Sequence, residues 1–232
     1  MRMRRMALAI AAAGAAVGIA YLAYVVGAYR RYGHAARPSA GEARAGLADA
    51  FMPAPEVAER HEVRVAAPAA VTFQAARKLD LRRSPAVRAI FGARELVFRV
   101  PGGRAEPPRS FVEEALALGW GVLAEAPGRE IVFGAVTQPW QGDVHFRALP
   151  PDRFAAFDEP GFAKIVWTLA ADSLAADTSV FRTETRVTTT DPTARTKFRW
   201  YWARFSPGIV LIRRVMLGLL KTDAERRALG RH

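Results

Sequence analysis

The sequence has no cysteine, only four histidines and few lysines. Without cysteine the chain has no disulfide, no thiolate nucleophile and no cysteine-ligated metal. The histidines stand too far apart in the sequence to predict a metal site from their spacing; they are His34, His61, His145 and His232. We therefore expect neither a metal nor another cofactor.

The sequence also lacks the short motifs of common nucleotide-binding and hydrolase sites. It contains no GxSxG elbow, no phosphate-binding loop and no dinucleotide-binding fingerprint. Gly102 and Gly103 are adjacent, but they do not join a predicted strand to a predicted helix. These absences leave enzymatic activity undecided, with a non-catalytic role as the first expectation.

Positive charge is present in excess, and it is concentrated at the two ends of the chain. The net charge is +12 in total, of which residues 1–38 carry +6 and residues 192–232 carry +8. Clustered arginine suits contact with phosphates, either of nucleic acid or of anionic lipid, and it is also found on solvated helix faces. Aromatic residues on an exposed basic sheet are not evident, so we expect no nucleic-acid partner.

The longest uncharged run covers residues 6–28, and it begins close to the N-terminus. About 20 apolar residues span a bilayer core, so residues 1–32 are predicted to be a single-pass membrane anchor. A cleaved signal peptide is the alternative interpretation. Arginines flank the run on both sides, which leaves its orientation undetermined. Gly14 and Gly18 have the GxxxG spacing that allows two such helices to pack in a homodimer.

Glycine and proline recur in residues 33–60, which are therefore predicted to be a linker before a folded domain over residues 61–222 and a tail over residues 223–232. Hydrophobic residues make up 51% of the chain, enough for a sizeable core. Further elements are expected from apolar periodicity and turn residues: short helices over 68–79 and 84–92, and strands over 119–126, 130–137, 142–148, 162–171 and 178–190.

The last fifth of the chain changes abruptly from a strand pattern to a helix pattern. Apolar or threonine residues alternate with charged ones over residues 179–190, which is typical of a half-buried strand. Asp191 and Pro192 then supply an N-cap and a first helical residue. An apolar stripe continues at steps of three and four from Phe198 to Leu219, which predicts a long C-terminal helix of one-sided apolar character.

Three segments carry a resemblance to a known family: VRVAAPAAVTFQAAR at 63–77, AEAPGREIVFGAV at 124–136, and ETRVTTTDPTARTKFRWYWARFSPGIVLIRR at 184–214. Together with the element order, they resemble the START-like, or SRPBCC, superfamily and its uncharacterised bacterial members. The resemblance implies an α+β, helix-grip fold in which a curved antiparallel sheet wraps around the C-terminal helix, here after one transmembrane helix. It also implies an apolar cavity between the sheet and that helix, but no particular reaction.

Within that fold, aromatic and threonine side chains on the strands and the closing helix are the candidate cavity residues. They are Trp120, Phe133, Trp167, Phe181, Thr183, Thr185, Phe198, Trp202 and Phe205. His145, two residues from Asp143, is the candidate general base of a catalytic alternative, and an exposed histidine is the plainer interpretation. Arg213 and Arg214 are expected to face a membrane surface.

The resulting functional expectation is a membrane-anchored protein that binds or transfers a small hydrophobic ligand such as a lipid, a polyketide or an isoprenoid. Two alternatives stay open. One is an enzyme similar to polyketide cyclases or aromatases that uses the same cavity. The other is a non-catalytic interaction module in which the helix packs tightly and its basic face binds a partner.

Overall fold

The computed structural model describes residues 2–32, 46–80, 84–85, 88 and 110–230. They form an α+β structure in which one antiparallel sheet carries a long C-terminal helix. The elements are α1 (Arg2–Arg31), η1 (Leu47–Ala50), β1 (Val57–Val65), α2 (Ala69–Arg77), α4 (Phe111–Ala117), β2 (Gly121–Ala126), β3 (Glu130–Thr137), β4 (Phe146–Arg147), α5 (Pro151–Phe154), β5 (Ala163–Ala175), β6 (Thr178–Thr189) and α6 (Pro192–Ala228).

The sheet has the strand order β1-β6-β5-β3-β2, with β4 paired to the end of β3. All its neighbouring strands run antiparallel, so successive residues point to opposite faces. The strand β6 shows the predicted alternation, because every second residue from Ser179 to Thr189 is buried. The first strand pairs with the last, and His61 lies opposite Thr183.

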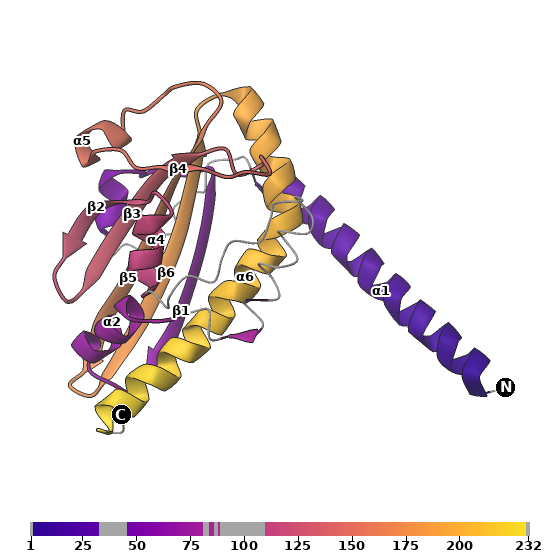
Figure 1. Ribbon diagram of the computed structural model, residues 1–232, viewed down its shortest axis with the longest axis horizontal. Helices are drawn as coiled ribbons and strands as arrows, with labels where there is room; N and C mark the ends of the chain where they lie inside the picture. The colour runs from indigo at the N-terminus through magenta and orange to yellow at the C-terminus, as the bar shows by residue number, and fades with distance from the viewer. Residues whose placement is uncertain (1, 33–45, 81–83, 86–87, 89–109, 231–232) are drawn as a thin grey trace.

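The helix α6 begins where the sequence predicts. The Asp191 carboxylate accepts hydrogen bonds from the backbone amides of Thr193 and Ala194, and Pro192 occupies the first turn. The helix is 37 residues long and continues through Pro207. It lies obliquely across one side of the sheet (Figure 1). An antiparallel sheet covered by a long C-terminal helix fits the predicted helix-grip fold.

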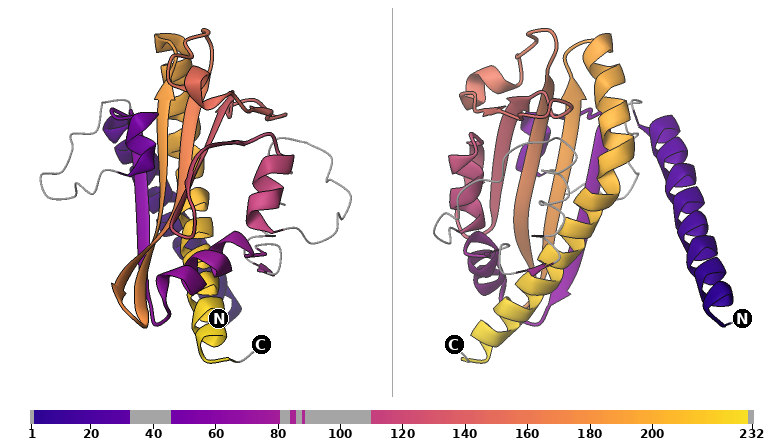
Figure 2. Two further views of the ribbon diagram at one scale, coloured as in Figure 1. Left: turned by 90° about the vertical axis from the view of Figure 1, so that its left-hand side faces the viewer. Right: turned by 45° about the vertical axis from the view of Figure 1, so that its right-hand side comes forward.

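The sheet separates two layers of packing. We call the face that carries Phe133, Trp167 and Phe181 the inner face; it packs with α2, α4 and the C-terminal half of α6. The opposite, outer face packs with η1 and α5 through Ala48 and Phe154, and with Met52 just after η1. Figure 2 shows α2 and α4 on one side of the sheet and η1 on the other. Because both faces are covered there, β3 is buried along its whole length.

Several boundaries differ from the sequence expectation. The expected linker over 33–60 is too long, because η1 packs on the outer face and β1 begins at Val57. The expected tail over 223–232 overlaps α6, which ends at Ala228. Of the strand expected over 142–148, only the two residues of β4 pair with the sheet. The helix expected over 84–92 lies mostly outside the described residues.

The N-terminal helix α1 meets the rest of the protein near its C-terminal end and then diverges from it (Figure 1). The Tyr21 hydroxyl donates to the backbone carbonyl of Arg204 at 2.8 Å, and the hydroxyls of Tyr24 and Ser206 lie 3.0 Å apart. Ala28 and Tyr32 are buried against the N-terminal half of α6. Thus, α1 is joined to α6 through its tyrosine-bearing side.

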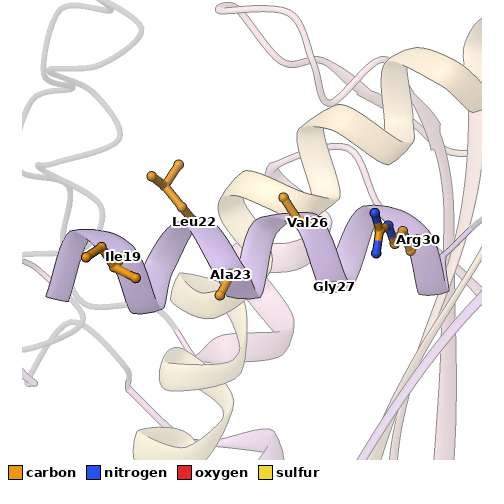
Figure 3. Close-up of a pocket in the computed structure, with 6 residues that line it drawn as sticks. All are labelled: Ile19, Leu22, Ala23, Val26, Gly27 and Arg30. Atoms are coloured by element: carbon orange, nitrogen blue, oxygen red, sulfur yellow. The ribbon is translucent and has the colours of Figure 1, made fainter. Parts of the chain in front are cut away.

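The opposite side of α1 is apolar and exposed. Leu22 and Val26 project from it (Figure 3), and they belong to a shallow open surface that also includes Ile19, Ala23 and Gly27 and ends at Arg30. Ile19 and Leu22 are 68% and 62% exposed. Among the described residues, no helix combines the length and the apolar character that crossing a membrane requires.

Candidate functional site

Trp167 is the centre of an aromatic group on the inner face of the sheet. It projects from β5 and stacks on Phe133 of the neighbouring strand β3, with 5.0 Å between ring centroids. Phe111 of α4 meets it edge to face at 4.7 Å, and Trp120 does so at 6.2 Å. Trp167 is 4% exposed, whereas Phe111 and Trp120 are only partly buried. The aromatic group therefore reaches from the core toward the surface.

A row of hydroxyls lies beside this aromatic group. Thr183 and Thr185 occupy alternate positions of β6, so both face inward. The indole nitrogen of Trp167 donates to Thr183 Oγ1 at 2.9 Å. The ring is thereby fixed in orientation by its neighbouring strand, because a buried indole N–H needs an acceptor.

Arg213 of α6 closes over these side chains. Its guanidinium donates to Thr183 Oγ1 at 3.0 Å and to Thr185 Oγ1 at 2.7 Å, and it lies 5.0 Å from the centroid of the Trp167 ring. No carboxylate forms an ion pair with it among the described residues. Burial lowers the pKa of Arg213 to about 10. The guanidinium is therefore still a cation at neutral pH, held by neutral partners alone.

Three arginines on the outer face have carboxylate partners. Arg129 and Arg182 both form ion pairs with Asp172, and Arg186 pairs with Glu184 of its own strand. For the two less exposed ones, Arg182 and Arg186, this is the usual arrangement for charges removed from water. The arrangement around Arg213 is different, because this partly buried guanidinium has two neutral hydroxyls as hydrogen-bond partners and no ion pair among the described residues. A cation removed from water without a counter-ion is energetically unfavourable.

A second polar group lies on β1, next to the threonines. His61 is opposite Thr183, and Glu59 is opposite Thr185, so all four side chains share the inner face. His61 Nε2 is buried without a hydrogen bond and lies 3.6 Å from Glu59 Oε2. The other oxygen of Glu59 accepts a 2.6 Å hydrogen bond from the hydroxyl of Tyr32, whose pKa is raised to about 12 by burial and by that bond.

Burial lowers the pKa of His61 below its ordinary value of 6.5, with Arg213 and Arg214 lowering it further and Glu59 opposing them. His61 is consequently neutral at physiological pH. The inner face therefore combines an aromatic surface, two threonine hydroxyls, a neutral histidine, the carboxylate of Glu59 and, in Arg213, a guanidinium that no carboxylate contacts among the described residues. Such a set can hold an apolar molecule by its body and an oxygen-bearing group by its end.

The folded protein should lose stability on mild acidification, and replacing His61 with asparagine (H61N) should make that loss smaller. Because the pKa of His61 is lower in the folded state, the unfolded chain takes up its proton first as the pH falls below 6.5, and the folded state loses stability until the folded pKa is passed. Urea unfolding at about pH 7.5 and about pH 5.5 measures the difference. H145N is the matched control, because it makes the same substitution at a histidine that is 83% exposed. An equal loss in H61N and the wild type would contradict the prediction.

The predicted cavity residues divide into two groups. Trp120, Phe133, Trp167 and Phe181 lie together on the inner face, next to Thr183 and Thr185. Phe198 and Trp202 lie apart from them, packed against Ala28 of α1, Tyr32 just after it and the nearby ends of three strands. Phe205 is partly buried, and its ring contacts Tyr201 on α6. Phe198 and Trp202 therefore lie in the contact with α1.

The other candidate residues are His145, Asp143, Arg213 and Arg214. His145 and Asp143 lie together, with 3.0 Å between Nε2 and Oδ2, and they are 83% and 80% exposed, which fits the plainer interpretation of an exposed histidine. A general base needs a site that positions its substrate, so this exposed pair is a poor candidate for one. Arg213 was expected at a membrane surface, yet its guanidinium turns inward; Arg214 is exposed. Within the described ranges, no three histidine, aspartate or glutamate side chains form a metal-binding group.

The sequence did contain signals for the residues that were overlooked. Arg213 lies four residues after Ile209 and three before Met216, so it interrupts the apolar stripe that faces the sheet. His61 alternates with Val63 and the buried Val65, which places it on the inner face of β1. Nothing in the spacing of Tyr32 indicated that its hydroxyl would reach Glu59.

Comparisons with known proteins give weak matches. No protein-family model matches the chain, and no curated protein matches it. Among solved structures it is similar to the Zhui aromatase/cyclase from Streptomyces sp. R1128, with 17% identity, coverage of 74% of this chain and 94% of that chain, and a TM-score of 0.27. It is also similar to norcoclaurine synthase from Thalictrum flavum, with 12% identity, coverage of 76% of this chain and 88% of that chain, and a TM-score of 0.27. An uncharacterised protein from Rhizobium leguminosarum matches with 12% identity, coverage of 73% of this chain and 97% of that chain, and a TM-score of 0.28. We draw no functional conclusion from similarities of this size.

Proposed function

We propose that this protein binds a small hydrophobic molecule between the inner face of the sheet and α6. The observation that supports this most directly is the aromatic group around Trp167, which continues from fully buried Phe133 to partly exposed Trp120 and Phe111. Aromatic surfaces accompanied by a few oriented polar groups are typical of sites for small apolar ligands. Lipids, polyketides and isoprenoids all have the required apolar body.

The test is ligand release and uptake by the full-length protein. Native mass spectrometry of the chain, purified in detergent before and after organic extraction, should show a small molecule that extraction removes. The extracted protein should then take up 1-pyrenebutanol, a neutral aromatic probe, as followed by pyrene fluorescence. A mass without bound ligand, together with no uptake of the probe, would overturn the proposal.

A pair of α6 variants assigns the uptake to the inner face. Val215 packs against the inner-face core, and Leu211 is 48% exposed on the same helix. Placing a tryptophan at Val215 fills space beside the aromatic group and should weaken probe binding at least about tenfold, a difference of about 1.4 kcal/mol. L211W adds the same ring outside the site and should bind as the wild type does. Equal binding by both variants would place the probe elsewhere, most simply on the apolar side of α1.

Catalysis of the cyclase type has little support from the residues that were predicted to perform it, because His145 and Asp143 are exposed at the surface. Membrane association has a separate basis. The exposed apolar side of α1, which includes Ile19, Leu22 and Val26, ends at Arg30, and an apolar surface beside a cation suits a bilayer with anionic headgroups. We therefore include association of α1 with a membrane in the proposal.

Vesicle flotation tests the membrane part. The full-length protein, mixed with phosphatidylcholine vesicles that contain phosphatidylglycerol, should rise with them in a density gradient. Protein that stays at the bottom as a dimer would instead indicate that the GxxxG pair, Gly14 and Gly18, joins two α1 helices. That outcome would overturn membrane association and leave the inner-face site unaffected.

A further inference from the structure

Arg213 determines what kind of hydrophobic molecule suits the inner face. Its two described hydrogen bonds go to neutral hydroxyls, Thr183 and Thr185, and it has no carboxylate partner among the described residues. Removing a cation from water without a counter-ion is costly, and a sequence that needed only packing would place an apolar residue in this part of the stripe. Arg213 is therefore a cation of the inner face that no carboxylate contacts among the described residues.

Among the described residues, neither of the two other ionisable groups of the inner face forms an ion pair or a hydrogen bond with Arg213. Glu59 already accepts a hydrogen bond from Tyr32 and lies 3.6 Å from His61. His61 is itself without a hydrogen bond at Nε2, and it lies opposite Thr183, whose hydroxyl Arg213 contacts. An acceptor-rich group placed here would meet a guanidinium, an imidazole nitrogen and threonine hydroxyls. Oxygen anions have that acceptor character.

We infer that the ligand of the inner face is an apolar molecule that carries a carboxylate, and that Arg213 binds this carboxylate through its guanidinium. This inference rests on the proposed function, because it specifies the ligand of the same site. The planar guanidinium matches a carboxylate in geometry, and its weak hydration makes it the cation best suited to a partly buried ion pair. The Trp167 ring beneath it would contact the apolar part of the ligand.

The test compares two probes that differ only at one end. 1-Pyrenebutyric acid and 1-pyrenebutanol share the ring system and the chain, and at neutral pH only the first is an anion. The extracted full-length protein should bind the acid about 10- to 100-fold more tightly than the alcohol, the range expected for charge-assisted hydrogen bonds. Association of either probe with the apolar side of α1, which ends at Arg30, is the same in all variants. The contribution of Arg213 is therefore the difference between the acid-to-alcohol ratio of the wild type and that of the Arg213 variant.

Two neighbouring arginines provide the variant and its control. R213M should bind acid and alcohol about equally, whereas R214M, which changes an exposed side chain of the same charge, should keep the preference for the acid. R213K retains a cation without the planar guanidinium and should keep only part of the preference for the acid. It therefore replaces R213M as the test variant if R213M does not fold.

The outcomes are distinguishable. If the wild type binds both probes equally, or if R213M keeps the preference for the acid, the carboxylate inference is overturned while the hydrophobic site stands. If neither probe binds the wild type, the proposed function fails and the inference fails with it.

Discussion

Truncating Phe181 to alanine should lower the free energy of unfolding by about 3–5 kcal/mol, the usual range for a buried phenylalanine. Phe181 is fully buried on β6, between Val63 of β1 and Ala171 of β5. It belongs to the same apolar cluster as Met216 and Leu220 of α6. The loss is therefore large, because the truncation leaves a cavity where the sheet and the C-terminal helix meet and the surrounding strands cannot close it.

Chemical denaturation followed by circular dichroism measures the F181A effect. Leu174→Ala is the matched control, because Leu174 lies near the end of the adjoining strand β5 and is 51% exposed. Its truncation should change stability by no more than about 0.5 kcal/mol. A loss below about 1 kcal/mol in F181A would mean that α6 does not close the inner face as described.

Replacing Gly119 with alanine should destabilise the protein by about 3 kcal/mol, from backbone strain and a steric clash together. Gly119 has a φ of +97°, a conformation that residues with a Cβ rarely adopt. An added Cβ would also lie 2.1 Å from the backbone carbonyl oxygen of Phe146. The backbone has to move to relieve that contact. This movement also disturbs the stacking of Trp120 on Phe146, whose ring centroids lie 5.0 Å apart.

The Gly128→Ala variant distinguishes backbone strain from steric clash, because it introduces only the strain. Gly128 in the β2–β3 turn has a φ of +73°, but an added Cβ there meets nothing within 4 Å. G128A should therefore lose only about 1 kcal/mol, from strain alone. Thermal unfolding of both variants tests the difference, and G119A should also bind the pyrene probes more weakly because Trp120 moves. Equal destabilisation by the two substitutions would exclude the contact with Phe146 as the cause.

The sequence was most informative where local rules decide the structure. Period-2 alternation located β6, and Asp191 located the start of α6. These signals depend on the backbone and on near neighbours, so they can be recognised in a single sequence. Pro207 lies inside α6. It removes one helix hydrogen bond, yet α6 continues through it, with the Tyr21 hydroxyl bound to the nearby carbonyl of Arg204.

The candidate site was only partly predictable, because its members come from distant elements. The aromatic residues and threonines of the strands lie on one face, and strand alternation indicates that face from the sequence. Phe198 and Trp202 were assigned to the same site because they share the helix stripe. However, α6 is long enough that its first half contacts α1 instead. The position of α1 on α6 depends on tertiary contacts that no local pattern encodes.

The pairing of β1 with β6 bears on how the chain folds during synthesis. Val65 lies opposite Ser179, and Val57 lies opposite Val187, so the two strands are separated by more than a hundred residues of intervening chain. At about 5–20 residues per second, the ribosome adds that length in roughly 6–26 seconds. Throughout this interval β1 has no strand to pair with, and loop closure over such a span makes the final step slow compared with forming the β5–β6 hairpin. The sheet is therefore completed from its last hairpin toward its first strand, late in translation.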